Sequence, residues 1–600
     1  MKIKELCISN LRSIVDSGSI PVLNLLALVG ENNAGKSNTL IAVRAFLSGG
    51  SGGIKKDDFF DPEIPIKIKI TFDDLNDFEK TRWKKYLAAS QLILEKQIWL
   101  DSEADADAYK IKSEYHGYES QPVDWFLSPS QIVERNGNRP RWADIVRDNG
   151  LPEYFLEDGR CNKQQFIKAL DRYLEENEVD YNEPDLSETQ ALGLQSKVIS
   201  SLPSFHLLPA ITDYSDEIDK RQKTSTFRKL MGELSDRILR NDPRYNEVEE
   251  ALARVQGLLN DLAGEGTGER LVSLGTIEAQ IGTLLRELMP SVSSVNLSVQ
   301  IDEIKDLFSG GVALSVNDGV ETDVLAKGHG LQRCIVFSLL RTLIETEKEH
   351  RDDAAQPPSS IILGIEEPEL YIHPQLCKLF YDVMRAFGET DQVLYTTHSP
   401  IFIDAYHYKE VAVAAKPSVE IGTKIKTASE EFFEDLNERK IFKGLSRFNP
   451  GVNELFFAKN VLLLEGPEDL IATTSTLLKI GVIRNRIEEI GWTPIVAGGK
   501  EAIPFFQRVM NSFEIPYSVL HDTDINESTP PAVADNHRRN NETIETLSAG
   551  RPIHRYPFKL EDTLGLDNHL RDQYLANQFF ADPNNINDAI ETIIRGVFNL

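Results

Sequence analysis

The eight residues from Gly30 to Ser37 constrain the fold of this 600-residue chain more than any other stretch. They read Gly-x-x-x-x-Gly-Lys-Ser, a loop whose glycines let successive backbone N–H groups point at phosphate oxygens. In such a loop Lys36 reaches the β- and γ-phosphates, and the Ser37 hydroxyl can bind Mg²⁺. An apolar run at 25–29 predicts a buried strand before the loop, and helical spacing at 38–47 predicts a helix after it. These flanks favour a nucleotide-binding α/β domain over an ordinary turn that contains glycine.

The overall composition restricts the function less than this loop does. The chain has 94 acidic and 65 basic side chains, and its net charge is −29. Because contacts with phosphates need Lys and Arg, it is not an obvious nucleic-acid binder, although the average can hide local basic patches. Its four scattered cysteines form no C-x-x-C pair, which predicts a cytoplasmic protein without a disulfide scaffold. No apolar run approaches 18 residues, so we expect no membrane span.

Two further strand ends carry residues that suit phosphate chemistry. The apolar run at 361–365 is followed by Glu366 and Glu367. The first carboxylate can hold Mg²⁺, and the second can orient the attacking water. A second apolar strand at 393–397 ends at His398, where a sensor of the γ-phosphate would lie, although a structural histidine is the alternative.

A glycine-rich segment precedes the predicted helix at 334–343. Gly328 and Gly330 stand just before it, and Gln332 follows them. Glycines ahead of a helix N-terminus make an anion site, whereas an ordinary loop–helix junction is the default alternative.

Together, the segments GENNAGKS, G-x-G-x-Q-R, IILGIEEPE and TTHSP resemble the ABC-type ATPases of SMC, RecF and OLD-family proteins. The resemblance implies that two subunits enclose each ATP between the phosphate loop of one and the glycine-rich segment of the other. It also implies that Glu366 supports Mg²⁺, that Glu367 is the catalytic base and that His398 is the switch histidine. The residues that the resemblance assigns to the bound nucleotide are Gly30, Asn33, Gly35, Lys36, Ser37, Asn38, Gly328, Gly330, Gln332 and Glu366.

Acidic residues recur at predicted strand ends in the last 150 residues, after buried runs at 461–464 and 517–521. Carboxylates gathered at such ends repel one another unless divalent cations lie between them, and two such cations can clamp the oxygens of a phosphodiester. Solvated strand–helix turns, which are commonly acidic, are the alternative. The candidate metal ligands in this part of the chain are Glu465, Asp469, Asp522, Asp524, Glu561 and Asp562.

The glutamate after one strand and the D-x-D after a later one resemble the Toprim domain of topoisomerases, primases and OLD nucleases. With the ATPase motifs, nearly the whole chain resembles the OLD family, which includes the nuclease subunit of the Gabija phage-defence system. The family typically has a lysine downstream of the last acidic cluster. Here no lysine follows Lys559, so Arg595 is the candidate catalytic replacement, and Lys559 is the other possibility. In this interpretation Glu465, Asp522 and Asp524 are also catalytic.

The resemblance implies a DNA endonuclease that nicks or cleaves, depends on Mg²⁺ or Mn²⁺, is regulated by ATP and acts in bacterial anti-phage defence. The alternative is a RecF/SMC-like repair or sensor ATPase whose Toprim domain is catalytically silent. We expect a homodimer or tetramer that binds DNA. Some relatives work with a helicase-like protein and others with a retron, so a partner of either kind encoded nearby stays open.

The expected fold class is α/β: an ABC-type phosphate-loop ATPase with a helical dimerisation insertion, followed by a C-terminal Rossmann-like Toprim domain. Apolar residues at i, i+3, i+4 and i+7 predict the helical arm, for which a bundle packed on its own sheet is the alternative. The insertion within the first lobe has no assigned function. The expected parts are the ATPase N-terminal lobe at 1–215 with an insertion at 75–205, the helical arm at 216–290, the ATPase C-terminal lobe at 291–450 and the Toprim domain at 451–600.

Overall fold

The structure is a computed structural model in which the chain divides into two compact units. One unit contains residues 1–205, 359–361 and 403–600, and the other contains 206–358 and 362–402. The structure describes the whole chain except residues 89, 103–108, 120–121, 138–139, 178, 181, 183–184, 192–194, 211–243, 261–270, 289–295, 298–314, 329, 333, 337, 340, 343–359, 429, 434–449, 567–569 and 571–572.

The N-terminal part of the first unit is an antiparallel sheet that packs on a helix. Along β5 (Ile66–Asp73), alternate side chains are buried over the first half of the strand, as the alternation of apolar residues predicts. Helix α1 (Lys36–Leu47) contacts the sheet, where the Phe46 ring lies 6.1 Å from that of Phe72 and 5.4 Å from that of Tyr115. In order across the sheet, the main strands are β2 (Ile14–Asp16), β1 (Lys2–Leu11), β5 (Ile66–Asp73), β7 (Gln91–Ser102), β8 (Tyr109–Glu119) and β9 (Asp185–Gln190).

The strand before the phosphate loop is β4 (Leu25–Gly30), and all six of its residues are buried. It runs parallel to β15 (Val411–Ala415), which pairs with β16 (Lys424–Thr427) in the antiparallel sense. A strand that is buried on both faces reads as a continuous apolar run, which is why 25–29 could be predicted.

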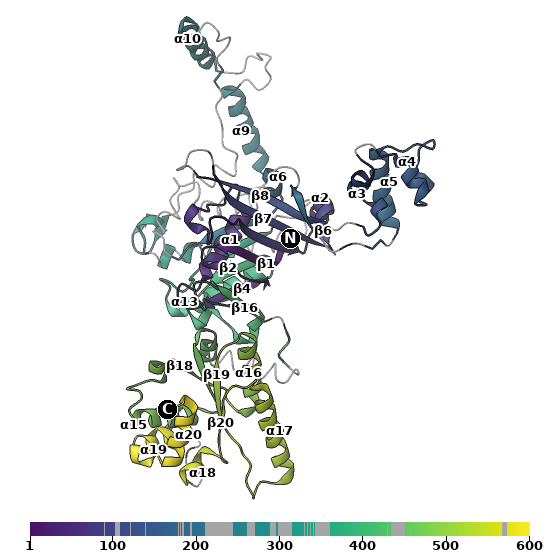
Figure 1. Cartoon of the computed structure of the whole chain (residues 1–600). Coiled ribbons are helices and arrows are strands. Elements are labelled where there is room, and N and C mark those ends of the chain that lie inside the picture. Colours follow the sequence, from purple (N-terminus) through teal and green to yellow (C-terminus); the bar gives the residue numbers. More distant parts are fainter. Residues whose placement is uncertain are drawn as a thin grey trace. The chain divides into compact units, whose positions relative to one another are not determined.

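The predicted insertion contains a small helical module (Figure 1), and its apolar residues form a hydrophobic core of their own. Its helices are α3 (Pro129–Asn136), α4 (Trp142–Asp148) and α5 (Lys163–Glu176). The rings of Trp142 and Phe166 lie 5.0 Å apart inside it. This part of the chain folds around its own apolar residues.

The second unit contains the described part of the helical arm. Helices α9 (Tyr245–Leu259) and α10 (Val272–Leu288) lie within the predicted helical arm, whereas residues 216–243, 261–270 and 289–290 of the arm lie outside the described residues. No residue of α9 is buried, and Val248 and Val255 are 44% and 45% exposed. The apolar side of α9 therefore lacks a covering element among the residues that the structure describes.

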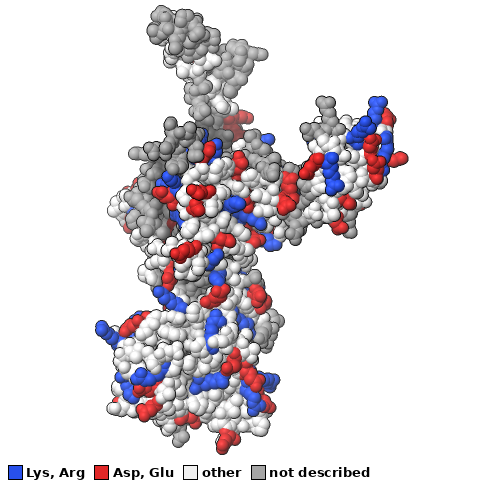
Figure 2. All heavy atoms as spheres, in the orientation of Figure 1, with Lys and Arg blue, Asp and Glu red and all other residues white. Residues whose placement is uncertain are grey.

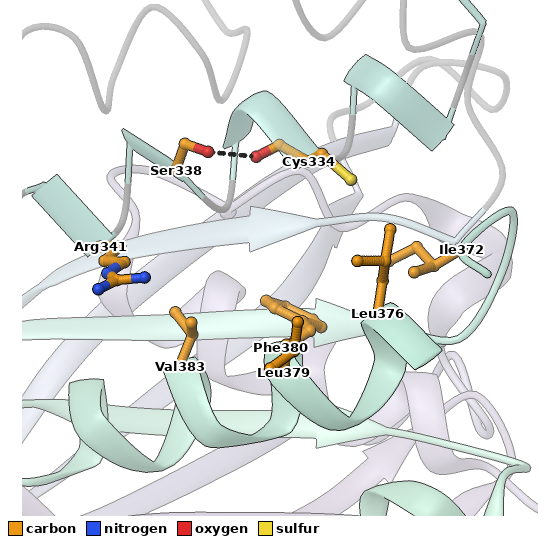
Figure 3. Close-up of a pocket in the computed structure, with 8 residues that line it drawn as sticks. All are labelled: Cys334, Ser338, Arg341, Ile372, Leu376, Leu379, Phe380 and Val383. Carbon is orange, nitrogen blue, oxygen red and sulfur yellow. Dashed lines mark hydrogen bonds between the residues drawn. The ribbon is translucent and has the colours of Figure 1, made fainter. Parts of the chain in front are cut away.

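The same unit contains two parallel strands, β13 (Ile361–Glu366) and β14 (Gln392–Thr396), with helix α13 (Pro374–Gly388) between them in sequence. A mainly apolar cavity of about 190 Å³ lies beside α13 (Figure 3). Its lining residues are Cys334, Ser338, Arg341, Ile372, Leu376, Leu379, Phe380 and Val383.

The C-terminal domain is a four-stranded parallel sheet with helices on both faces (Figure 1). The strands, in sheet order, are β18 (Trp492–Val496), β17 (Asn460–Leu464), β19 (Tyr517–Asp522) and β20 (Ile553–Tyr556). The helices are α15 (Pro467–Lys479), α19 (Gln573–Phe580) and α20 (Asp588–Phe598) on one face and α16 (Ile503–Ser512) and α17 (Pro531–Leu547) on the other.

All four strands point the same way, so their carboxyl ends meet at one edge, where sites form in open α/β sheets. The predicted strands at 461–464 and 517–521 are confirmed. Among the described helices of the whole chain, none is both long and apolar enough to cross a membrane.

Candidate functional site

The phosphate loop has the backbone conformation that its glycines allow. Gly35 has φ 97° and is packed against the side chains of Ser13 and Thr423, which leave no space for a Cβ atom. Asn33 is also left-handed, with φ 62°. Helix α1 begins at Lys36, so its N-terminus and the positive end of its dipole face the loop.

Lys36 is held across the loop by its own backbone. Its side chain is 7% exposed, and Nζ donates to the Gly30 carbonyl at 3.0 Å and the Glu31 carbonyl at 2.8 Å. Gly30 itself packs on the Ala414 backbone of β15 too closely for a side chain. The ammonium is thus fixed beside the curve of the loop by groups five and six residues away in sequence.

The beginning of α1 is tied to neighbouring strands. Asn38 donates from Nδ2 to the Ser13 hydroxyl at 2.8 Å and accepts from Arg12 at 3.4 Å. The Ser13 hydroxyl also bonds the Thr423 hydroxyl at 2.8 Å. Asn38 therefore braces the loop in this structure, while Ser37 is half-buried next to it.

The carboxylates predicted for ATP hydrolysis belong to the second unit. Glu366 ends β13 and accepts the Ala210 N–H at 3.2 Å. Glu367 follows with φ 44°, a left-handed conformation that is unusual for a side-chain-bearing residue, and its N–H donates to the Thr396 carbonyl at 2.9 Å. The bend turns the chain sharply directly after the strand.

A neighbouring carboxylate holds the histidine loop in place. Glu369 accepts the Thr397 hydroxyl at 2.9 Å and the His398 N–H at 2.6 Å. The His398 side chain is exposed. We did not predict a role for Glu369, although its position three residues after Glu366 within one acidic run was a visible signal.

Of the three residues predicted in the glycine-rich segment, Gly330 and Gln332 are closely packed and Gly328 is not. A Cβ atom on Gly330 would lie 2.7 Å from the Tyr371 carbonyl oxygen, whereas Gly328 faces open space. Gln332 is 2% exposed and donates to the carbonyls of Val324 at 3.1 Å and Lys327 at 2.9 Å. This arrangement fixes the start of the helix that follows.

At the carboxyl edge of the C-terminal sheet lie four acidic side chains that we call the acidic centre: Glu465, Asp469, Asp522 and Asp524. The end of β19 is linked to that of β17 because the Asp522 N–H donates to Glu465 Oε2 at 3.2 Å. The Leu560 N–H donates to Asp522 Oδ1 at 3.1 Å, and the Gly466 N–H donates to Asp469 Oδ2 at 2.8 Å. Residues predicted separately from two strands are thus brought together.

The acidic centre is electrostatically strained. Burial, followed by the neighbouring carboxylates, raises the pKa of Asp522 to about 9. Burial also raises the pKa of Asp469 to about 8 and increases the pKa of Glu465. The buried Tyr556 hydroxyl has no hydrogen-bond partner among the described residues, and Asp469 and Asp522 are close enough to help raise its pKa. Burial and mutual repulsion thus disfavour the charged forms of Glu465, Asp469 and Asp522.

Asp524 differs from the other three because it has a buried ion-pair partner. Lys500 Nζ lies 2.5 Å from Asp524 Oδ2, and the two side chains are 6% and 15% exposed. Sequence analysis missed Lys500. It follows β18 directly after Gly498 and Gly499, both with positive φ, and a glycine pair after an apolar strand is a signal that could have identified it.

The remaining predicted residues lie at the border of the acidic centre or outside it. Glu561 is half-buried and contributes to the raised pKa values of Asp469 and Asp522, whereas Asp562 is exposed. Arg595 binds Glu591 within α20 through two contacts of 3.0 and 2.9 Å, and its side chain is 43% exposed.

The acidic centre has the donor chemistry of a magnesium or manganese site, since both ions prefer carboxylate oxygens. Its buried acids and the unpaired Tyr556 hydroxyl also fit a cation. Yet no group of three His, Cys, Asp or Glu side chains in the described part of the chain is already arranged around a metal position. Each of the four carboxylates instead accepts a hydrogen bond from a different donor.

Two family models match the chain. Residues 1–403 match the AAA ATPase domain, and residues 456–524 match the TOPRIM domain of proteins like the overcoming lysogenization defect protein. The second match contains all four residues of the acidic centre.

Three curated relatives are similar over different lengths. The Old nuclease of Escherichia phage P2 is 23% identical over 536 residues, which cover 87% of this chain and 77% of the relative. The OLD nuclease of Thermus scotoductus is 32% identical over 167 residues, which cover 27% of this chain and 30% of the relative. Endonuclease GajA of Bacillus cereus is 23% identical over 475 residues, which cover 78% of this chain and 67% of the relative.

Proposed function

Because the chain belongs to the AAA ATPase domain family and, with its Toprim domain, to the OLD-family nucleases, we propose that it is a DNA endonuclease that depends on a divalent metal and is regulated by ATP. The proposal extends to bacterial anti-phage defence, in keeping with the resemblance to GajA. Mg²⁺ or Mn²⁺ bound at the acidic centre would stabilise the charge that develops on the phosphodiester oxygens.

The observation that supports the nuclease most strongly is the convergence of the acidic centre. Glu465 and Asp522 come from different strands, 57 residues apart, yet a direct hydrogen bond links them. Buried carboxylates without a neutralising charge are unfavourable, and such perturbed groups cluster at functional sites. This arrangement favours a nuclease over a sensor with a silent Toprim domain.

In the proposed ATPase cycle, the phosphate loop binds the nucleotide through Lys36 and Ser37. Glu366 supports Mg²⁺, Glu367 activates the attacking water and His398 senses the γ-phosphate. These roles are carried over from the family pattern, and they are supported by the position of Lys36 in the phosphate loop and of Glu366 at the end of β13. Figure 2 shows Lys and Arg scattered among Asp and Glu over the visible face, so the net charge of −29 leaves room for local contacts with DNA phosphates.

The proposed assembly is a homodimer or a tetramer. The exposed apolar side chains of α9 support the helical arm as a dimerisation element, because a second copy would cover them. Light scattering of the full chain at micromolar concentration should give at least twice 67.6 kDa. A monomer with and without ATP would contradict this assembly.

Incubation with supercoiled plasmid tests the nuclease directly. The full chain should convert the plasmid to nicked or linear DNA with Mg²⁺ or Mn²⁺ and should leave it intact when EDTA removes the metal. Persistence of supercoiled DNA with both metals, with and without ATP, would favour the sensor ATPase instead.

A further inference from the structure

The most unusual pair in the acidic centre is Lys500 with Asp524. Both side chains are largely buried, and the distance between Nζ and Oδ2 is 2.5 Å. An ammonium group this close contributes a full positive charge at the same carboxylate that a divalent cation would need. A divalent cation at either oxygen of Asp524 would lie close to this ammonium and would be repelled by it.

Two other basic side chains face Asp524 but are held less closely. His537 Nδ1 lies 3.6 Å from Oδ2, and Lys559 Nζ lies 3.8 Å from Oδ1. The Lys559 side chain is 44% exposed and that of Lys500 is 6% exposed. Because solvent screens exposed charges, Lys500 is the cation with the greatest influence on this carboxylate.

The backbone around Lys500 is tied to the acidic centre itself. The Gly499 N–H donates to the Glu465 carbonyl at 3.0 Å, and the Ala502 N–H donates to the Gly499 carbonyl at 3.1 Å. The main chain of Lys500 therefore stays next to the centre, whereas its four-carbon side chain can rotate. Displacement of the ammonium from Asp524 would therefore move this side chain rather than the sheet.

We propose that Lys500 is a built-in counter-ion of Asp524 that a divalent cation must displace, so that this lysine sets the metal affinity of the acidic centre. The inference rests on the proposed metal-dependent function. A divalent ion wins this competition because it carries two charges and can engage several carboxylates, whereas the ammonium engages one. Lys500 thereby acts through Asp524 as a positioning residue.

The test is calorimetric titration of the full chain with MnCl₂, without nucleotide or DNA. Lys500→Met should bind Mn²⁺ at least about tenfold more tightly than the unaltered protein, because a nearby positive charge has been removed. Lys500→Arg, which keeps the charge, should stay within about threefold, and so should Lys559→Met, which removes a more exposed lysine facing the same carboxylate. Asp522→Asn removes one carboxylate of the acidic centre, so any heat that remains with this variant comes from Mn²⁺ that binds elsewhere on the protein.

Equal or weaker Mn²⁺ binding by folded Lys500→Met would overturn the inference, and so would equally tight binding by Lys559→Met and Lys500→Met. Absence of Mn²⁺ binding at the centre in both the unaltered protein and Lys500→Met would overturn the proposed metal site as well. If Lys500→Met does not fold, a crystal of the unaltered protein soaked in MnCl₂ decides. Manganese bound at Asp524 with Nζ moved beyond 4 Å supports displacement, and manganese bound with the ion pair intact contradicts it.

Discussion

The phosphate loop and the acidic centre hold their charged groups in opposite ways. Lys36 is fixed by carbonyls five and six residues away, within one continuous motif. The carboxylates of the acidic centre are fixed from a distance: Asp522 is linked to Glu465 across 57 residues, and Lys500 to Asp524 across 24. The first site is built by local backbone geometry, whereas the second exists only when the parallel sheet has formed.

This difference affects how each site responds to substitution. In the phosphate loop, the cation is surrounded by fixed dipoles that compensate its charge locally. In the acidic centre, charges compensate one another, so changing one side chain alters the others. We therefore expect substitutions in the phosphate loop to abolish ATP hydrolysis alone. The effect of a substitution around the acidic centre should depend on how deeply the changed side chain is buried.

The largest effect is expected for ATP turnover. Lys36→Ala removes the cation for the β- and γ-phosphates and should reduce ATP hydrolysis by roughly 10²-fold or more. Glu367→Gln should lose hydrolysis and keep nucleotide binding, as measured by phosphate release and by titration with a fluorescent ATP analogue. The control is Lys459→Ala, since Lys459 pairs with Glu31 beside the loop but is 71% exposed. If Glu367→Gln hydrolysed ATP at the parental rate, the assignment of Glu367 as the catalytic base would be wrong.

A second buried lysine extends the comparison to stability. Lys96 is fully buried in β7, and its Nζ donates to the carbonyls of Ala45 at 2.7 Å and Ser48 at 2.8 Å, at the C-terminal end of α1. Lys96→Met removes the donor to both carbonyls, of which only that of Ser48 also accepts from the Tyr115 hydroxyl, and should lower the free energy of unfolding by about 2 kcal/mol. Chemical denaturation measures this, with exposed Lys112→Met as the control.

Lys96 also predicts a pH dependence. Burial lowers its pKa to about 7, below the value of about 10.4 in an unfolded chain. Between these values the unfolded chain binds a proton that the folded chain does not, so this residue makes stability increase as pH rises from about 7 to 10. The slope of unfolding free energy against pH in this window should decrease in Lys96→Met. An unchanged slope would show that Lys96 stays charged when buried.

A small effect is expected for Arg595→Ala. Arg595 pairs with Glu591 on a partly exposed helix face, and such pairs contribute about 0.5 kcal/mol or less. Plasmid nicking should stay within about threefold of the parental rate. A loss of tenfold or more, with unchanged thermal stability, would instead identify Arg595 as the basic group that replaces the family's lysine.

Sequence predicted the parts of both sites that local patterns encode. The phosphate loop, Glu366 at the end of β13 and the strands before Glu465 and Asp522 follow from apolar runs and motif spacing. Lys500 was missed because it follows β18 while its partner Asp524 follows β19, and these two strands approach each other only across β17 in the folded sheet. The insertion could not be interpreted because its helical module packs around a hydrophobic core of its own, and its sequence carries none of the ATPase or Toprim motifs.

The ion pair of Arg595 with Glu591 could have been predicted from the sequence, although it was not. Its distance from the last acidic cluster suggested a role in cleavage, but the i, i+4 spacing to Glu591 gives it a partner on its own helix. Spacing along the chain predicts contacts within a helix more reliably than contacts between the end of a strand and a distant helix.

The most direct test of the central claim compares nicking and ATP hydrolysis in one preparation of Asp522→Ala. Asp522 links two strands of the acidic centre and lies far in sequence from the phosphate loop. Removing its carboxylate should abolish Mn²⁺-dependent nicking of supercoiled plasmid while ATP hydrolysis stays within a few-fold of the parental rate. Nicking by Asp522→Ala at the parental rate would contradict the assignment of the acidic centre as the site of DNA cleavage.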